Sequence, residues 1–150
     1  MAKKNKLKAP AFDKGKYASI TKEACEPSSE SQYPVFALYN NMNLGKEFSI
    51  EGCNKEEKLK IIDILCRLSK LTWAQIRTEP KQALGYEQIS LDQINKNIPE
   101  NITPPINPDD KLMIFRFGPK KSKQYRMTGY RREDIFYILW IDTKLKLYKH

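Results

Sequence analysis

The sequence predicts an α+β domain in which N-terminal helices pack on a small, twisted antiparallel sheet formed mainly by a C-terminal meander. Residues 111–117, 124–130 and 135–141 are rich in β-branched and aromatic residues, and turn or charge clusters separate them, a pattern typical of antiparallel strands. Residues 61–71 instead carry apolar side chains at helical spacing. The length of 150 residues fits one domain with its own core.

The N-terminal residues differ from the rest in composition. Seven lysines precede Glu23, and few residues in this stretch are apolar. Such a segment cannot bury enough surface to offset its ordering entropy. We therefore expect a flexible basic arm over 1–32 and a single α+β domain over 33–150. Composition leaves open whether this arm aids solubility, follows a phosphate backbone or docks into a partner.

The first part of the domain predicts strands and then a helix. Residues 34–39 and 48–51 resemble short strands around a turn-rich connector at 40–45. Asn54 is a suitable N-cap for the helix, because glutamates follow it in the first turn. The apolar positions of this helix form one stripe, namely Ile61, Ile64, Leu65, Leu68 and Leu71. Cys66 lies beside the stripe and is expected in the core.

The middle of the chain predicts shorter elements. Thr72 caps a second helix that ends before Pro80. Residues 81–89 are expected to form a loop, and residues 90–93 resemble a capping box for one or two further turns. Four prolines then predict an extended linker over 97–110 that leads into the meander.

The meander divides its side chains between two faces. Residues 135–141 are apolar throughout, which predicts a central strand covered on both faces. In 111–117, Met113, Phe115 and Phe117 share one face and Leu112, Ile114 and Arg116 the other; in 124–130, Tyr125 and Met127 oppose Arg126, Thr128 and Tyr130. A matching register would bring the two arginines and the last tyrosine together, and we expect them on an uncovered side of the sheet.

Charge predicts a polyanionic partner. The formal net charge is +9, which favours RNA, DNA or a membrane surface. Between 111 and 132 the chain has eight basic residues and no acidic one. The basic side chains expected to contact nucleic acid are Lys120, Lys121, Lys123, Arg131 and Arg132.

Targeting signals and cysteines predict a cytoplasmic protein without a membrane span. The sequence has no run of 18 apolar residues, and its N-terminus lacks the apolar region of a secretory signal. Its three cysteines are widely spaced and odd in number, which favours reduced thiols.

Most site types lack their motifs. One histidine and scattered cysteines give no zinc spacing, and neither a glycine-rich phosphate loop nor a GxSxG elbow occurs. We therefore expect no metal and no cofactor. RNA cleavage without metal remains open, because the 2′-hydroxyl of RNA is the nucleophile and the protein need only move protons and stabilise phosphate charge. Arginine suits the second task, and Tyr130, Tyr148 or His150 supplies a proton or stacks on a base.

Short motifs in the second half resemble known families. FRFG (115–118), YR (125–126), IFYILWI (135–141) and LY (147–148), placed after two helices, resemble the RelE/HigB/ParE-type toxins, whose RelE-type members cleave messenger RNA, often on the ribosome. That resemblance implies the strand arginines at Arg116 and Arg126, and the C-terminal aromatic at Tyr148. The closing FYILWIDTKLKLY is also similar to small uncharacterised bacterial and phage-associated proteins ending FYIVWLDPxHKLYP. Those proteins have histidine in place of Leu145 and proline in place of Thr143.

These observations leave three interpretations. The first is a metal-independent endoribonuclease, or mRNA interferase, of a toxin–antitoxin or phage-defence system. Its catalytic residues would be Arg116, Arg126, Tyr130 and Tyr148, and its partners RNA or the ribosome and an antitoxin protein. The second is a nucleic-acid-binding protein without catalysis, so enzymatic activity itself stays open. The third is a protein–protein interaction module of phage or defence origin.

Overall fold

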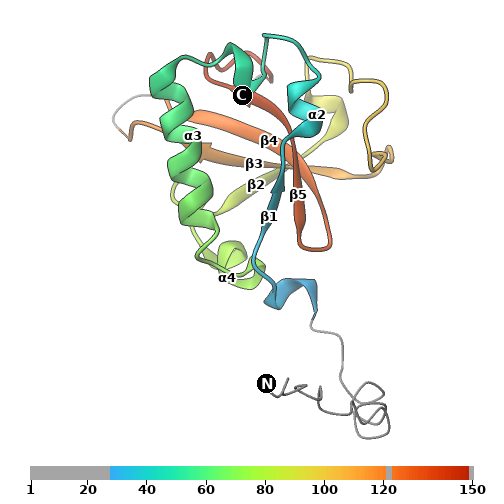
Figure 1. Cartoon of the computed structure of the whole chain (residues 1–150). Helices are drawn as coiled ribbons and strands as arrows, with labels where there is room; N and C mark the ends of the chain where they lie inside the picture. Colours follow the sequence, from blue (N-terminus) through green and yellow to red (C-terminus); the bar gives the residue numbers. More distant parts are fainter. Residues whose placement is uncertain (1–27, 121–122, 149–150) are drawn as a thin grey trace, which may run out of the picture.

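The computed structural model describes residues 28–120 and 123–148, in which five strands form one sheet in the order β1-β5-β4-β3-β2 (Figure 1). The strands are β1 (Val35–Ala37), β2 (Tyr86–Ser90), β3 (Lys111–Phe117), β4 (Tyr125–Arg132) and β5 (Ile135–Asp142). Strands β2 to β5 form an antiparallel meander, and β1 pairs in parallel with β5 at one edge. The predicted α+β class and C-terminal meander are confirmed.

The two main helices begin where the sequence predicts. Helix α3 (Lys55–Leu68) has a capping box in which Asn54 accepts from the Glu57 N–H at 2.9 Å and the Glu57 side chain accepts from the Asn54 N–H at 2.8 Å. Helix α4 (Trp73–Thr78) has the same arrangement between Thr72 and Gln75. Each box satisfies N–H groups that the first turn leaves without helical partners.

One face of the sheet is covered by α3 and α4. The α3 stripe buries Ile61, Ile64 and Leu68 completely and Leu65 partly. These side chains pack on sheet residues of one alternating set, including Met113, Phe115, Phe117, Met127, Phe136 and Ile138. Figure 1 shows α3 lying along this side of the sheet. Burial of apolar area is the main stabilising term for such a layer.

The opposite face is covered by α2 (Tyr39–Met42), by the segment between β2 and β3, and by the residues after β5. Ile98, Ile102 and Ile106 of the proline-rich segment pack against this face, as does Leu147. The predicted extended linker is therefore a covering layer. The expectation of an open face is wrong over most of the sheet, because these isoleucines bury it.

Strand β5 contains an irregularity that places two consecutive apolar residues on one face. Thr128 pairs with Trp140, but Gly129 pairs with Ile138, so Leu139 is extra. Leu139 and Trp140 both belong to the second core. A Cβ at Gly129 would lie 2.1 Å from the carbonyl oxygen of Tyr137, so the close approach of the strands requires glycine there. Both faces of β5 are covered, as predicted, although β4 is the middle strand.

Four local predictions are wrong. Residues 48–51 are not a strand but contribute to the short 3₁₀ helix η2 (Ile50–Gly52), and the connector 40–45 contains α2. The predicted loop 81–89 contains most of β2, which forms by pairing with β3 rather than from a strong local pattern. Cys66 is exposed, because it lies on the outer side of α3.

The folded body extends further towards the N-terminus than composition predicts. Residues 28–32, assigned to the basic arm, include the 3₁₀ helix η1 (Ser29–Ser31). Gln32 accepts a backbone hydrogen bond from Trp73 at 3.0 Å, and η1 contacts α4. The remainder of the predicted arm, residues 1–27, lies outside the described residues.

Candidate functional site

Arg116 of β3 and Arg126 of β4 are direct cross-strand partners. Alternation places both on the sheet face that also carries Ile114 and Thr128, as predicted. Directly opposed residues of antiparallel strands have Cβ atoms about 4.5–5.5 Å apart, and like charges at that separation are destabilising. The pair therefore requires neighbouring negative charge.

Glu87 of β2 supplies that charge. Its Oε2 accepts from Arg116 Nη2 at 3.0 Å and lies 3.7 Å from Lys81 Nζ. Its Oε1 accepts a hydrogen bond from the Tyr148 hydroxyl at 2.6 Å. Three predicted site residues, Arg116, Arg126 and Tyr148, are thus brought together, and Glu87 is a member that the sequence analysis missed. We call these four residues the arginine-pair site.

Tyr148 also contacts the second arginine. The guanidinium carbon of Arg126 lies 4.6 Å from the centroid of the Tyr148 ring, within the range of a cation–π interaction. Arg126 and Tyr148 are only 7% and 6% exposed, whereas the side chains of Arg116 and Glu87 keep 23% and 18% exposure. Solvent therefore reaches the site mainly from the Arg116–Glu87 side.

Several donors in the site have no partner among the described residues. They are Nε of Arg116 and both Nε and Nη1 of Arg126, and all three are buried. Asp142 lies opposite Arg126 in the register, but its oxygens accept from the Lys144 and Leu147 N–H groups at 3.1 and 2.8 Å. Unsatisfied buried donors are costly, and a guanidinium presents them in the planar arrangement that suits phosphate oxygens.

The environment moves two pKa values in opposite directions. Burial raises the pKa of Glu87, but the Tyr148 hydrogen bond and the charges of Arg116 and Lys81 outweigh burial and hold this pKa below its ordinary value. Burial, followed by the hydrogen bond to Glu87, raises the pKa of Tyr148 well above its ordinary value, against the opposing charge of Arg126. At neutral pH the site therefore holds an ionised carboxylate, a proton acceptor, beside a protonated phenol, a proton donor.

Tyr130 lies elsewhere on the same face. It is four residues along β4 from Arg126, roughly 13 Å at the rise of a strand, and is fully buried. Its hydroxyl donates to the Pro104 carbonyl at 2.6 Å and accepts from Asn40 Nδ2 at 3.3 Å. Burial, together with nearby Tyr39, raises the pKa of Tyr130 to about 12. The structure does not bring this predicted catalytic residue to the arginine-pair site.

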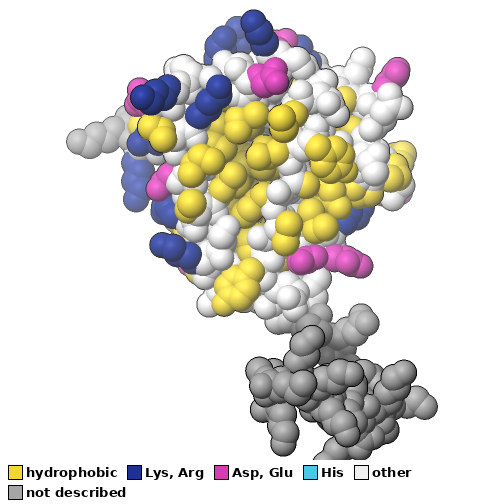
Figure 2. Space-filling model, in the orientation of Figure 1, with side chains coloured by type: hydrophobic (Ala, Val, Ile, Leu, Met, Phe, Trp, Pro, Cys, Tyr) yellow, Lys and Arg dark blue, Asp and Glu magenta, His cyan; other side chains and the backbone are white. Residues whose placement is uncertain are grey.

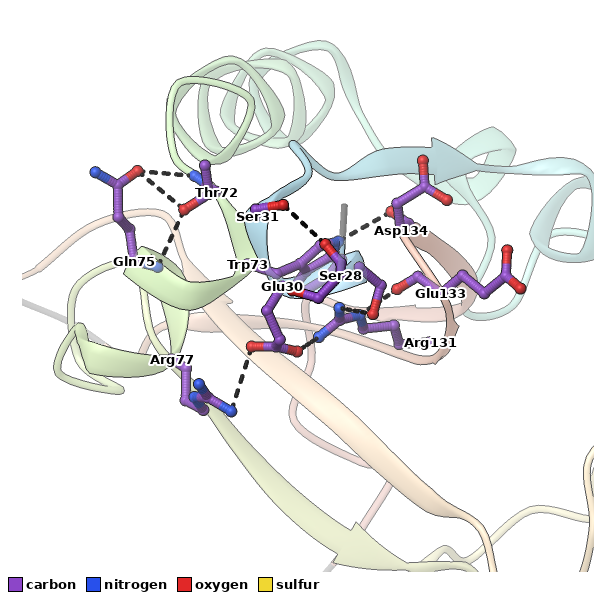
Figure 3. A network of polar contacts seen from close by, with 11 residues as sticks. Ser28, Glu30, Ser31, Thr72, Trp73, Gln75, Arg77, Arg131, Glu133 and Asp134 are labelled. Atoms are coloured by element: carbon purple, nitrogen blue, oxygen red, sulfur yellow. Dashed lines mark hydrogen bonds and ion pairs between the residues drawn. The ribbon is translucent and has the colours of Figure 1, made fainter. Parts of the chain in front are cut away.

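Arg131 is held by the N-terminal segment (Figure 3). Its Nη1 donates to Glu30 at 2.7 Å, its Nη2 donates to the Ser29 hydroxyl at 3.2 Å, and its Nε donates to the Glu133 carbonyl. Its guanidinium carbon lies 4.3 Å from the Trp73 ring centroid. Every nitrogen of this guanidinium has a partner, so Arg131 joins η1 to β4 and α4.

The other predicted basic contacts fall into two groups. Arg132 forms an ion pair with Asp110 and donates to the Pro105 carbonyl. Lys120 and Lys123 are exposed beside the β3–β4 turn, at the end of the hairpin that carries Arg116 and Arg126. Lys121 and His150 lie outside the described residues.

A second surface is apolar. Figure 2 shows hydrophobic side chains gathered at the centre of the face that carries β1, α2 and α3. The large apolar side chains of these elements that are strongly exposed are Val35, Tyr39, Met42, Leu59 and Ile62. Exposed patches of this kind mark interaction surfaces in many proteins.

The described residues contain no group of three His, Cys, Asp or Glu placed to hold a metal ion. Their helices are all too short or too polar to cross a bilayer. Comparison with protein-family models, with curated proteins and with solved structures found no match to this chain.

Proposed function

We propose that this protein binds single-stranded RNA through Arg116 and Arg126 and cleaves it without a metal ion. The observation that carries the proposal is a pair of opposed guanidinium groups, with buried donors that lack partners, beside the ionised Glu87. Arginine stabilises the charge that develops on a phosphate during transfer, and a carboxylate within the same site is a suitable general base.

The reaction follows from the chemistry of these groups. Glu87 accepts the proton of the 2′-hydroxyl, and the 2′-oxygen forms a bond to phosphorus as the bond from phosphorus to the 5′-oxygen breaks. Tyr148 gives its proton to the leaving 5′-oxygen, so the products are a 2′,3′-cyclic phosphate and a 5′-hydroxyl. The Glu87 proton then returns to Tyr148 through the hydrogen bond of 2.6 Å that joins them. Arg116 and Arg126 hold the phosphate oxygens throughout.

The test uses the whole chain and a labelled single-stranded RNA in the presence of EDTA. We expect cleavage to 2′,3′-cyclic ends, and resistance when the nucleotide at the cleavage position carries no 2′-hydroxyl. Glu87→Gln keeps the shape of the side chain but removes the base, so cleavage should fall at least about 100-fold. Binding of RNA should stay equal or tighten, because a negative charge leaves the site.

A matched change controls for loss of a carboxylate in general. Asp110→Asn also converts an acid to its amide, beside Arg132 at the far end of the sheet. This variant should cleave like the wild type. Equal loss in both variants, or unchanged cleavage in Glu87→Gln, would overturn the catalytic assignment.

A second candidate function is RNA binding without cleavage. It is favoured by the deep burial of Arg126 and by the occupation of both Glu87 oxygens, since in-line attack requires space around phosphorus. Tight binding of RNA that stays intact over long incubation would select this candidate.

The toxin resemblance extends the first candidate. By that resemblance the RNA is messenger RNA, read in the cytoplasm and often on the ribosome, and an antitoxin protein is a further partner. The exposed apolar surface of β1, α2 and α3 is where we propose that such a partner docks. Protein added to a translating extract should then shorten messenger RNA at ribosome-bound positions.

A further inference from the structure

A cavity lies between the residues around η2 and those that follow β5. Its volume is about 90 Å³, and its walls include Phe48, Ser49, Cys53, Ile141 and Asp142. The Ile141 N–H donates to the Phe48 carbonyl at 2.8 Å, which joins the two walls. This volume is well above the roughly 10–15 Å³ that one water molecule requires, so the cavity can hold a small polyatomic group.

The shape of the cavity depends on a glycine. A Cβ at Gly52 would lie 1.8 Å from the carbonyl oxygen of Lys46. Both residues line the cavity, so the backbone of this close approach forms part of its wall. A side chain at position 52 would therefore disturb this wall.

Ser49 belongs to the cavity lining and carries a hydroxyl without a hydrogen bond among the described residues. The residue is 1% exposed. A buried hydroxyl of this kind is unfavourable unless it meets an acceptor. An oxygen of a bound group would satisfy this hydroxyl once it turns towards the cavity.

Charge around the cavity favours an anion. Lys46, Lys144 and Lys146 belong to its lining and are exposed, and no ion pair occupies them within 28–120 and 123–148. The two lining carboxylates are engaged elsewhere. Glu47 pairs with Lys96 at 3.2 Å, and Asp142 accepts two backbone N–H groups of the turn that follows it.

We propose that this cavity binds a phosphate group, and that in RNA it holds a phosphate close to the one bound by Arg116 and Arg126. The neighbourhood follows from the register, because Asp142 of the cavity wall is the direct partner of Arg126. Ser49 Oγ donates to one phosphate oxygen and the lysines neutralise the charge. The identification of RNA as the source of the phosphate rests on the proposed function.

The experiment is a titration of the full chain with inorganic phosphate, and separately with a short single-stranded RNA, followed by amide NMR spectroscopy. Both ligands should shift the amide signals of Gly52 and Thr143. Ser49→Ala should weaken phosphate binding about tenfold, since it removes a hydrogen bond to a charged group. Its melting temperature should not fall, because the hydroxyl has no partner to lose.

A lysine pair gives the matched control. Lys144→Ala should weaken binding of both ligands, whereas Lys70→Ala, at an exposed lysine outside the cavity, should not. Unmoved Gly52 and Thr143 signals with both ligands would overturn the inference, as would unchanged phosphate affinity in Ser49→Ala. RNA that shifts only signals around Arg116 and Arg126 overturns this subsite but supports the proposed function. Phosphate binding here without any RNA binding would contradict the proposed function and the assignment of the phosphate to RNA.

Discussion

The two ends of the β3–β4 hairpin use the same residue type in different ways. At one end Arg116 and Arg126 oppose each other, and three of their nitrogens lack partners among the described residues. At the other end every guanidinium nitrogen of Arg131 donates a hydrogen bond, and Arg132 pairs with Asp110. The basic character of the segment therefore does not reveal which arginines have all their hydrogen-bond partners within the fold.

The difference follows from the carboxylates that the fold supplies. At the end away from the turn, Glu30 of η1 pairs with Arg131, and Asp110, which precedes β3, pairs with Arg132. Near the turn, Glu87 pairs with Arg116 and Lys81, and among the described residues no ion pair includes Arg126. A positive excess near a surface favours an anionic ligand, whereas matched charges stabilise the fold alone. We therefore interpret the end with Arg116 and Arg126 as a binding site. The end with Arg131 and Arg132 stabilises the fold.

The largest expected effect is on the free energy of unfolding, and it differs between the two ends of the hairpin. Arg131→Met should lower the free energy of unfolding by about 2 kcal/mol, because Glu30 and Ser29 lose charge-assisted hydrogen bonds. Arg126→Met should change it by less than about 1 kcal/mol, since an apolar side chain of similar length replaces a poorly satisfied buried charge. Urea denaturation measures both values. The reverse order would mean that Arg126 holds the fold.

Tyr130 and Tyr148 should differ in the same way as the arginines, one in stability and the other in RNA cleavage. Tyr130→Phe should lower the free energy of unfolding by about 1–2 kcal/mol, because the buried Pro104 carbonyl and Asn40 amide lose a partner. RNA cleavage should not change. Tyr148→Phe should instead reduce cleavage strongly, since it removes the proposed proton donor. Loss of cleavage in Tyr130→Phe, with the free energy of unfolding unchanged, would mean that Tyr130 takes part in the reaction.

Acid pH tests the carboxylate at each end. The pKa values of Glu87 and Asp110 lie below their ordinary values. Their stabilising contribution is therefore complete above the unfolded pKa of about 4, and it is lost as pH falls through the folded value. Glu87→Gln and Asp110→Asn should each flatten the fall in stability between about pH 5 and pH 2. Denaturation midpoints across this range measure the effect, and an unchanged slope in Glu87→Gln would contradict the assigned ionisation.

The smallest stability effect is expected at the turn. Lys120→Ala and Lys123→Ala should change the free energy of unfolding by no more than about 0.5 kcal/mol, since both are exposed. Each should lower the slope of log affinity for RNA against log salt by about 0.7 if its lysine contacts a phosphate. Titrations at several salt concentrations give the slope.

Alternation predicts the arginine pair correctly but not its surroundings. The period of two in 111–117 and 124–130 assigns Arg116 and Arg126 to one face, and the observed register makes them partners. Tyr130 shares that face, so periodicity alone groups it with the arginines. Its burial depends on Ile98, Ile102 and Ile106, which come from a proline-rich segment. Regularly spaced isoleucines between prolines are the signal that this segment covers a core.

Glu87 was beyond local sequence signals. Tyr86–Ser90 contains few β-branched residues, and its strand is stabilised by pairing with β3. This non-local register places Glu87 beside Arg116. The path of the chain after β5 brings Tyr148 to the same carboxylate. The cavity beside Asp142 similarly depends on a close approach at Gly52 that composition does not indicate.

The most direct test of the central claim compares RNA affinities of variants from the two ends. A labelled single-stranded RNA is titrated with the wild type, Arg126→Met and Arg132→Met, and fluorescence anisotropy reports binding at fixed salt. We predict that Arg126→Met weakens affinity about tenfold or more, from loss of charge-assisted hydrogen bonds, and that Arg132→Met leaves it nearly unchanged. Equal affinities for all three proteins, with folds intact, would contradict the account.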